Sequence, residues 1–219
     1  MSARCDLVLP CRDEAAALPA VIAAVPDTFA VIVVDNGSRD GTADVARRLG
    51  ARVVHEERAG YGAAVHSGIE AATAEFVAVM DGDGSMGPAD LLPLLGDVEA
   101  GRATMAVGRR RPVTSGAHPW HARWGNALVL AWLRRRTGLA VRDIAPMRVC
   151  RTVDLLDLGL EDRRFGYPVE LLVKAQAAGW VLTEHDITYR PRAAGTSSKV
   201  SGTVKGTLRT ARDFARMLP

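Results

Sequence analysis

Short apolar runs alternate with segments of helical periodicity over the first hundred residues. The runs are rich in valine and cover residues 5–10, 29–34, 51–55, 75–80 and 104–108, and the helical segments cover 13–25, 40–50, 60–73 and 88–101. Strands of four to six residues that each precede a helix are typical of β-α-β units and a mostly parallel sheet. Because the runs are apolar throughout, we expect helices on both faces of that sheet.

The second half of the chain continues with less regular spacing. Its pattern predicts helices over 119–138, 167–178 and 203–218, strands over 146–150 and 180–189, and a glycine-serine loop over 192–202. A chain of 219 residues, 48% of them hydrophobic, can bury roughly 70% of its unfolded surface. We therefore expect a single Rossmann-like α/β domain over residues 1–219.

Cysteine usage and the length of the apolar runs indicate a cytoplasmic protein. Cys5, Cys11 and Cys150 lack CxxC spacing and support neither a disulfide framework nor a zinc knuckle. The longest uninterrupted apolar run, 127–133, is much shorter than the ~20 residues that cross a bilayer. The N-terminus has no long apolar stretch of the signal-peptide kind. We expect no transmembrane segment.

Charge is distributed unevenly along the chain. Residues 1–101 carry 7 Lys and Arg against 16 Asp and Glu, residues 102–151 carry 11 against 1, and residues 152–219 carry 10 against 8. The split predicts that an acidic, metal-holding half meets a basic half that handles an anion. Nucleic acid is not expected as that anion, because the chain has no helix-turn-helix, zinc-finger or aromatic RNA-binding pattern.

Polar or glycine-rich segments follow three of the predicted strands, at residues 10–14, 35–42 and 81–85. Ligands of parallel α/β sheets bind beyond the carboxyl ends of the strands, where these segments would meet. Asp, Asn and Gly also form ordinary surface turns, so each segment alone is open to that interpretation. Three such segments at one edge favour a binding site.

Asp81 and Asp83 place two like charges one residue apart at the end of a predicted buried strand. Two carboxylates about 4 Å apart repel by roughly 1 kcal/mol in water and by more inside a protein, and a bound cation reverses that sign. Mg²⁺ or Mn²⁺ with one or two carboxylates and substrate phosphates suits Asp81, Asp83 and Ser85. A calcium EF-hand is excluded, because Met86 and Leu92 stand where it needs glycine and glutamate.

Several motifs occur in a characteristic order: VDNGSRDGT over 34–42, GYG over 60–62, DGD over 81–83 and YPVELLVKAQAAG over 167–179. This set resembles the inverting family 2 glycosyltransferases of the GT-A fold, in particular the dolichyl-phosphate and polyprenyl-phosphate mannose and glucose synthases, whose motifs are VDDGSxDGT and DxD. The resemblance runs from Leu7 to about Gly206. It implies a metal-dependent transfer of a hexose from UDP-glucose or GDP-mannose to a polyprenyl or dolichyl phosphate.

The resemblance also assigns candidate residues, with the nucleotide sugar bound by residues 1–108 and the acceptor by residues 109–219. The metal would be held by Asp81 and Asp83. The nucleotide-sugar candidates are Pro10, Arg12, Glu14, Asp35, Gly37, Gly60, Tyr61, Gly62, Asp81 and Gly82. The phosphate or acceptor candidates are Arg109, Arg148, Arg192, Ser198 and Lys199. Arg12 stands where the family usually has an aromatic residue, which leaves the nucleobase open.

Two of these assignments have a physical basis of their own. The glycines at 60 and 62 open a predicted helix, where backbone N–H groups can approach a phosphate. Guanidinium groups match phosphate oxygens bidentately, which favours Arg109 and Arg192 as phosphate ligands. We expect Arg110, Arg111 and the arginines at 134–136 to be solvated or interfacial.

The acceptor decides whether a general base accompanies Asp83 in catalysis. A hydroxyl acceptor needs a carboxylate within hydrogen-bond reach, and Asp143, Asp162 and Glu170 are candidates. A phosphate acceptor is already anionic at pH 7, and the basic segment 102–151 favours this acceptor. The arginine-flanked sequence ALVLAWL in that segment suits either a helix at the inner face of a membrane or an ordinary core helix.

Three alternatives stay open at this point. The same transfer to a soluble hydroxyl acceptor would use one of the candidate bases. A sugar-phosphate nucleotidyltransferase would need a glycine-rich loop with lysine after the first strand, where LPCRDEAAAL stands. A sugar-nucleotide-binding protein without catalysis would need the same cleft.

Overall fold

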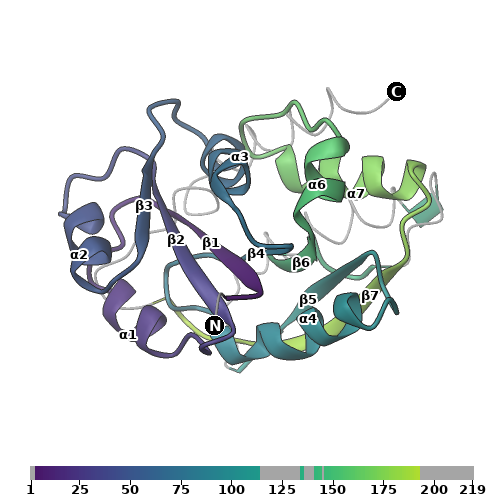
Figure 1. Ribbon diagram of the computed structural model, residues 1–219, viewed down its shortest axis with the longest axis horizontal. Helices are drawn as coiled ribbons and strands as arrows, with labels where there is room; N and C mark the ends of the chain where they lie inside the picture. Colours follow the sequence, from purple (N-terminus) through teal and green to yellow (C-terminus); the bar gives the residue numbers. More distant parts are fainter. Residues whose placement is uncertain (1–2, 114–133, 136–140, 145, 193–219) are drawn as a thin grey trace.

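The computed structural model describes residues 3–113, 134–135, 141–144 and 146–192, and the elements follow the predicted alternation (Figure 1). The strands are β1 (Cys5–Cys11), β2 (Phe29–Asp35), β3 (Arg52–His55), β4 (Phe76–Val79), β5 (Met105–Pro112), β6 (Met147–Arg151) and β7 (Leu182–Tyr189). The helices are α1 (Leu18–Ala23), α2 (Thr42–Arg48), α3 (Tyr61–Ala71), the 3₁₀ turn η1 (Pro88–Asp90), α4 (Leu91–Glu99), α6 (Thr152–Asp157) and α7 (Tyr167–Ala177).

The strands form one sheet in the order β3-β2-β1-β4-β6-β5-β7. β1 pairs in parallel with β2 and β4, β2 with β3, and β5 with β7. β6 is antiparallel to both β4 and β5. The prediction of a mostly parallel mixed sheet is therefore confirmed, and strands from both halves of the chain share it.

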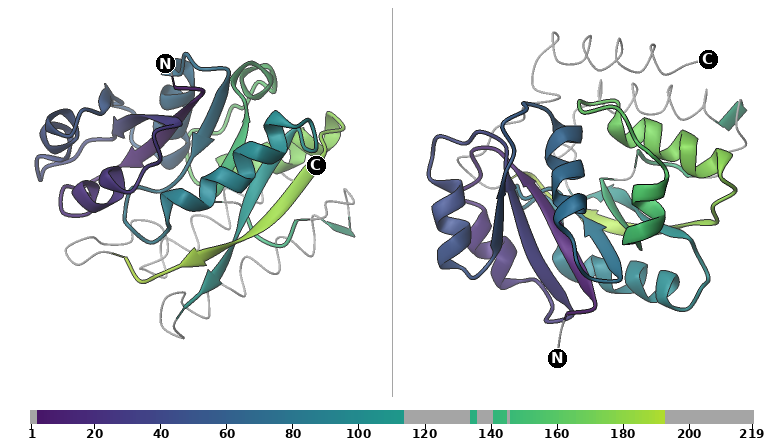
Figure 2. Two further views of the ribbon diagram at one scale, coloured as in Figure 1. Left: turned by 60° about the horizontal axis from the view of Figure 1, so that its bottom comes forward. Right: turned by 45° about the horizontal axis from the view of Figure 1, so that its top comes forward.

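Helices cover both faces of the sheet, as predicted, and form one core on each face. Along β1, Leu7 and Leu9 join the core that also holds side chains of α1, α2 and α4, and Val8 between them joins the core of α3, α6 and α7. Figures 1 and 2 show these two layers of helices. β4 is apolar throughout because both of its faces are buried, whereas β5 and β7 also carry charged residues.

Two helices differ from the prediction. α1 begins at Leu18 instead of residue 13, since Asp13 adopts a left-handed φ of 58° and Pro19 is tolerated only in the first helical turn. α6 was not predicted, because its six residues are too few to show a clear helical period. Of the predicted helix 119–138 only residues 134–135 are described, and the predicted helix 203–218 lies outside the described residues. No helix within the described ranges is both long and apolar enough to cross a membrane.

Candidate active site

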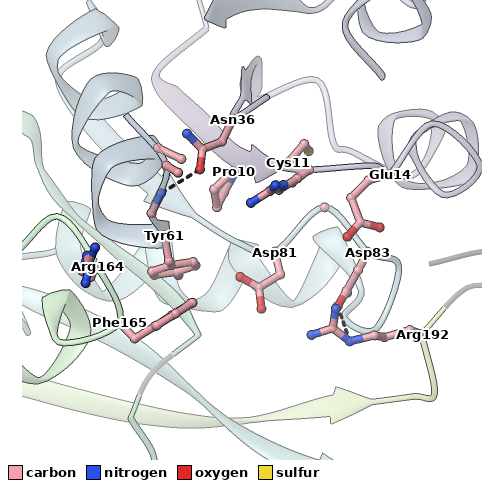
Figure 3. Close-up of a pocket in the computed structure, with 15 residues that line it drawn as sticks. Pro10, Cys11, Glu14, Asn36, Tyr61, Asp81, Asp83, Arg164, Phe165 and Arg192 are labelled. Carbon is pink, nitrogen blue, oxygen red and sulfur yellow. Dashed lines mark hydrogen bonds and ion pairs between the residues drawn. The ribbon is translucent and has the colours of Figure 1, made fainter. Parts of the chain in front are cut away.

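A cleft of ≈ 350 Å³ opens beyond the carboxyl ends of β1, β2 and β4, where the three polar segments were predicted to meet. Figure 3 shows its side chains. The cleft is lined by Pro10, Cys11, Arg12, Glu14, Asn36, Ala59, Gly60, Tyr61, Ala64, Asp81, Gly82, Asp83, Arg164, Phe165 and Arg192.

The loop after β4 places both aspartates in this cleft. Gly82 packs so closely on β1 that a Cβ would lie 2.5 Å from the Sγ of Cys11, so the residue between the aspartates must be small. The Oδ1 of Asp83 accepts a hydrogen bond from the Ser85 N–H at 2.9 Å, and its Oδ2 lies 3.0 Å from the Arg192 Nε. The predicted pair is thus held side by side at the sheet edge.

The electrostatics of the pair suit a cation. Burial raises the pKa of Asp81 above its usual range, and the neighbouring Asp83 charge raises it further. Within the described residues no group of three or more His, Cys, Asp or Glu side chains is arranged around a metal position. Two carboxylates facing an open cleft fit Mg²⁺ or Mn²⁺, which complete their coordination with phosphate oxygens and water.

The predicted nucleotide-binding residues divide into two groups. Pro10, Arg12 and Glu14 line the cleft. Asp35 and Gly37 do not: the Oδ1 of Asp35 accepts the Ser38 N–H at 3.0 Å, and Gly37 turns the chain with a φ of 77°. Asp35 and Gly37 thus hold the loop after β2, and the nucleotide contact expected of them stays a prediction.

Asn36 lines the cleft and was missed by the sequence analysis. Its Nδ2 donates to the carbonyl oxygens of Glu56 at 2.8 Å and Arg58 at 2.9 Å, and its Oδ1 accepts the Gly60 N–H at 3.0 Å. An aspartate, which the family motif has at this position, has no hydrogens to donate to the two carbonyls. The amide thus anchors the segment between β3 and α3 that forms one wall of the cleft.

The start of α3 has a packing role in addition to the phosphate contact predicted for it. The Gly60 N–H is bound by Asn36, and the Gly62 N–H donates to the Arg164 carbonyl at 3.0 Å. A Cβ on Gly60 would lie 2.1 Å from the Arg163 carbonyl oxygen. The glycines let residues 163 and 164 lie against the helix, and Gly60 and Tyr61 both line the cleft.

This close approach brings the segment 160–166 to the cleft. Glu170 accepts hydrogen bonds from the N–H groups of Glu161 and Asp162, and Asp162 accepts the Arg164 N–H at 2.6 Å. Neither carboxylate lines the cleft, so the structure does not bring these two candidate bases together with Asp81 and Asp83. They hold the segment whose Arg164 and Phe165 line the cleft, two residues that no sequence motif singled out.

The arginines of β5 alternate between two environments. Arg110, which was expected to be solvated, forms a bidentate ion pair with Asp143, with Nη2–Oδ1 and Nε–Oδ2 distances of 2.6 and 2.8 Å. Arg109 and Arg111 lie near Asp186 on the neighbouring strand. Arg110 thus pairs with Asp143, whereas Arg109, the predicted phosphate ligand, lies near Asp186 and does not line the cleft.

The remaining candidates are placed as follows. Asp143 is buried, and hydrogen bonds from Arg110 lower its pKa although desolvation opposes the shift, so it is not a free general base. Arg148 is 1% exposed in the middle of the sheet, and its Cζ lies over the Tyr167 ring at 5.8 Å from the centroid. Arg192 reaches the cleft. Ser198 and Lys199 lie outside the described residues.

Comparisons with known proteins agree with this arrangement. Residues 6–151 match the profile of the family described as glycosyl transferase family 2. An uncharacterized glycosyltransferase of Mycobacterium tuberculosis is 53% identical over 213 residues, which are 97% of this chain and 96% of the relative. Polyprenol monophosphomannose synthase of Mycolicibacterium smegmatis is 31% identical over 217 residues, 90% of this chain and 80% of that protein.

Solved structures show the same fold. Glucosyl-3-phosphoglycerate synthase from Mycobacterium tuberculosis, in complex with Mn²⁺, UDP and glucosyl-3-phosphoglycerate, superimposes with a TM-score of 0.76. The match covers 97% of this chain and 79% of that one at 21% sequence identity. Another structure of that synthase contains Mg²⁺ and UDP.

Proposed function

Because this chain belongs to glycosyltransferase family 2, we propose that it moves a hexose from UDP-glucose or GDP-mannose to an acceptor phosphate, with a polyprenyl phosphate as the preferred acceptor. The chain is a hexosyltransferase of the GT-A fold. This membership sets aside the nucleotidyltransferase and the non-catalytic alternatives. The donor, the acceptor and the use of a metal are the parts that we propose.

The arrangement of carboxylates carries the proposal of a phosphate acceptor. Within the described residues, the carboxylates that line the cleft are those of Glu14, Asp81 and Asp83. Asp143 is paired with Arg110, and Glu170 is bound to backbone N–H groups. A hydroxyl acceptor needs a general base, whereas a phosphate acceptor is already ionised. In this scheme the metal occupies Asp81 and Asp83 and the nucleotide sugar occupies Glu14, so the cleft suits a nucleophile that brings its own charge.

The cations of the cleft support the same acceptor. Arg12, Arg164 and Arg192 line it in addition to the carboxylates, and guanidinium groups bind phosphate oxygens in a planar, bidentate way. One relative described above is also named for a sugar carried on a phosphate, polyprenol monophosphomannose. Three guanidinium groups can bind a donor diphosphate and an acceptor phosphate at the same time.

The residues have distinct tasks in this scheme. Asp81 and Asp83 would hold Mg²⁺ or Mn²⁺, which supplies Lewis-acid stabilisation of the diphosphate leaving group. Arg192 lies beside this pair and binds diphosphate oxygens. Tyr61 and Phe165 form an aromatic wall next to Asp81 (Figure 3), which excludes water from the sugar. Asn36 fixes the segment 56–60 that leads into Tyr61.

The acceptor is tested with radiolabelled UDP-glucose and GDP-mannose. The purified protein is incubated with each donor, Mn²⁺ and one of three acceptors: a polyprenyl phosphate in detergent, 3-phosphoglycerate, or a phosphate-free alcohol. We expect label in the organic phase with the polyprenyl phosphate. Product with 3-phosphoglycerate alone would move the assignment to a soluble acceptor, and product with the alcohol alone would contradict a phosphate nucleophile.

Metal use is tested with a matched pair of variants. Asp83→Ala should lose turnover and metal-dependent donor binding, because it removes a carboxylate from the cleft. Asp157→Ala removes an exposed carboxylate at the end of α6 and should keep both. Full turnover by the wild-type protein in excess EDTA would contradict the metal assignment.

A further inference from the structure

Arg192 covers the oxygen of Asp83 that faces the cleft. The Nε of Arg192 lies 3.0 Å from the Asp83 Oδ2 (Figure 3), while the Oδ1 is bound to the Ser85 N–H. The two atoms are in ionic contact, although their alignment does not make a hydrogen bond. The Asp83 side chain is 3% exposed and the Arg192 side chain 28%. A cation that binds the Oδ2 must therefore take the place of this guanidinium.

The backbone around Arg192 is tied to the aspartate loop. β7 ends at Tyr189, which forms an isolated bridge with Met86, and the Arg190 N–H donates to the Ser85 carbonyl at 2.8 Å. Arg192 follows two residues after this last contact. Its long side chain can exchange partners at the cleft while the backbone at residues 189 and 190 stays in place.

The charges of the cleft explain why Arg192 pairs with Asp83. Asp143 is neutralised by Arg110, and Asp83 is neutralised by Arg192. A divalent cation between Asp81 and Asp83 would lie next to the guanidinium, and two positive charges at such a distance repel. Arg192 and a divalent cation thus compete for Asp83.

We propose that Arg192 is a positioning residue that makes divalent cation and donor binding cooperative. Before the donor binds, Arg192 pairs with Asp83 and weakens cation binding. The donor diphosphate offers oxygens that a guanidinium binds bidentately, so Arg192 moves to the diphosphate and uncovers the Asp83 Oδ2. By linkage, the cation strengthens donor binding by the same factor. This inference rests on the proposed nucleotide-sugar donor.

The test measures Mn²⁺ binding without nucleotide, by the electron paramagnetic resonance signal of free Mn²⁺. Arg192→Ala should bind Mn²⁺ on the order of ten-fold tighter than the wild-type protein, within the range typical of coupling between sites. Arg192→Lys keeps the competing charge and should stay close to the wild type. Arg190→Ala removes an exposed arginine that does not line the cleft and should also match the wild type.

Two further measurements test whether the change in Mn²⁺ affinity depends on Asp83 and whether Arg192 contacts the donor. Adding Asp83→Ala to Arg192→Ala should abolish the tighter Mn²⁺ binding, because Arg192 and the cation compete for the Asp83 carboxylate. In EDTA, Arg192→Ala should bind UDP-glucose or GDP-mannose more weakly than the wild-type protein, and circular dichroism should show the same fold for all variants.

Two results separate the inference from the proposed function. If donors bind with metal but Arg192→Ala binds Mn²⁺ no tighter than the wild type, the competition is refuted and the proposed function stands. If neither donor binds to any variant with or without Mn²⁺, the proposed function fails and the inference fails with it.

Discussion

The contact between α3 and the segment 160–166 can be tested by adding one methyl group. A Cβ on Gly62 would lie 2.8 Å from the Arg163 carbonyl carbon, the Asp162 carbonyl oxygen and the Tyr167 Cβ. Two of these atoms are backbone and the third is a Cβ, so none can rotate away. Gly62→Ala must therefore push the segment that carries the cleft residues 164 and 165 away from α3.

The expected magnitude combines two opposing terms. Alanine is favoured over glycine inside a helix by about 1 kcal/mol, and overpacking a filled site costs about 1–3 kcal/mol. With three unyielding contacts we expect the upper part of that range, and a net loss of about 2 kcal/mol. Gly96→Ala in α4 is the matched control, because its Cβ would meet nothing within 4 Å and only the helical gain of about 1 kcal/mol applies.

Differential scanning calorimetry measures both variants. A change of 1 kcal/mol shifts the Tm of a chain of this size by roughly 2–4 °C, so Gly62→Ala should lower the Tm by roughly 4–8 °C and Gly96→Ala should raise it by roughly 2–4 °C. Trypsin should also cut at Arg163 or Arg164 faster in Gly62→Ala. A Tm of Gly62→Ala equal to or above that of the wild type would refute the close packing.

Three further predictions follow from individual contacts. Asn36→Asp removes two donated hydrogen bonds and should destabilise the fold by about 2–4 kcal/mol; an unchanged urea midpoint would contradict the anchoring role. Asp143→Asn leaves the Arg110 charge without its carboxylate and should cost about 3–5 kcal/mol, so a loss below about 1 kcal/mol in urea unfolding would argue against this pair. The hydrogen bond with His185 lowers the pKa of Asp97 from 3.8 to about 2, so its stabilisation is present above pH 3.8 and lost as the pH falls toward 2. Asp97→Asn should therefore show a flatter fall of the urea midpoint between pH 4 and 2, and identical slopes would exclude this contribution.

The elements and the edge of the sheet that holds the site could be predicted from the sequence. Valine-rich runs and helical spacing are local features, and the helices cover both faces of the sheet as these features predicted. Because parallel strands bring their carboxyl ends to one edge, the segments at 10–14 and 81–85 were expected together, and Pro10, Glu14, Asp81 and Asp83 share the cleft. These predictions need only short stretches of chain and the geometry of β-α-β units.

The tertiary structure decided which side chains face the cleft and which hold it in place. A period of two predicts that Arg109 and Arg110 point to opposite faces of β5, but only the packing of Asp143 beside the strand shows which arginine it pairs with. Likewise, Asn36 bonds to residues 56–60, and residues 163 and 164 meet the start of α3 about a hundred residues earlier. Local patterns specify an element and its apolar faces, whereas contacts between loops of distant β-α units arise only when the sheet brings those loops to the same edge.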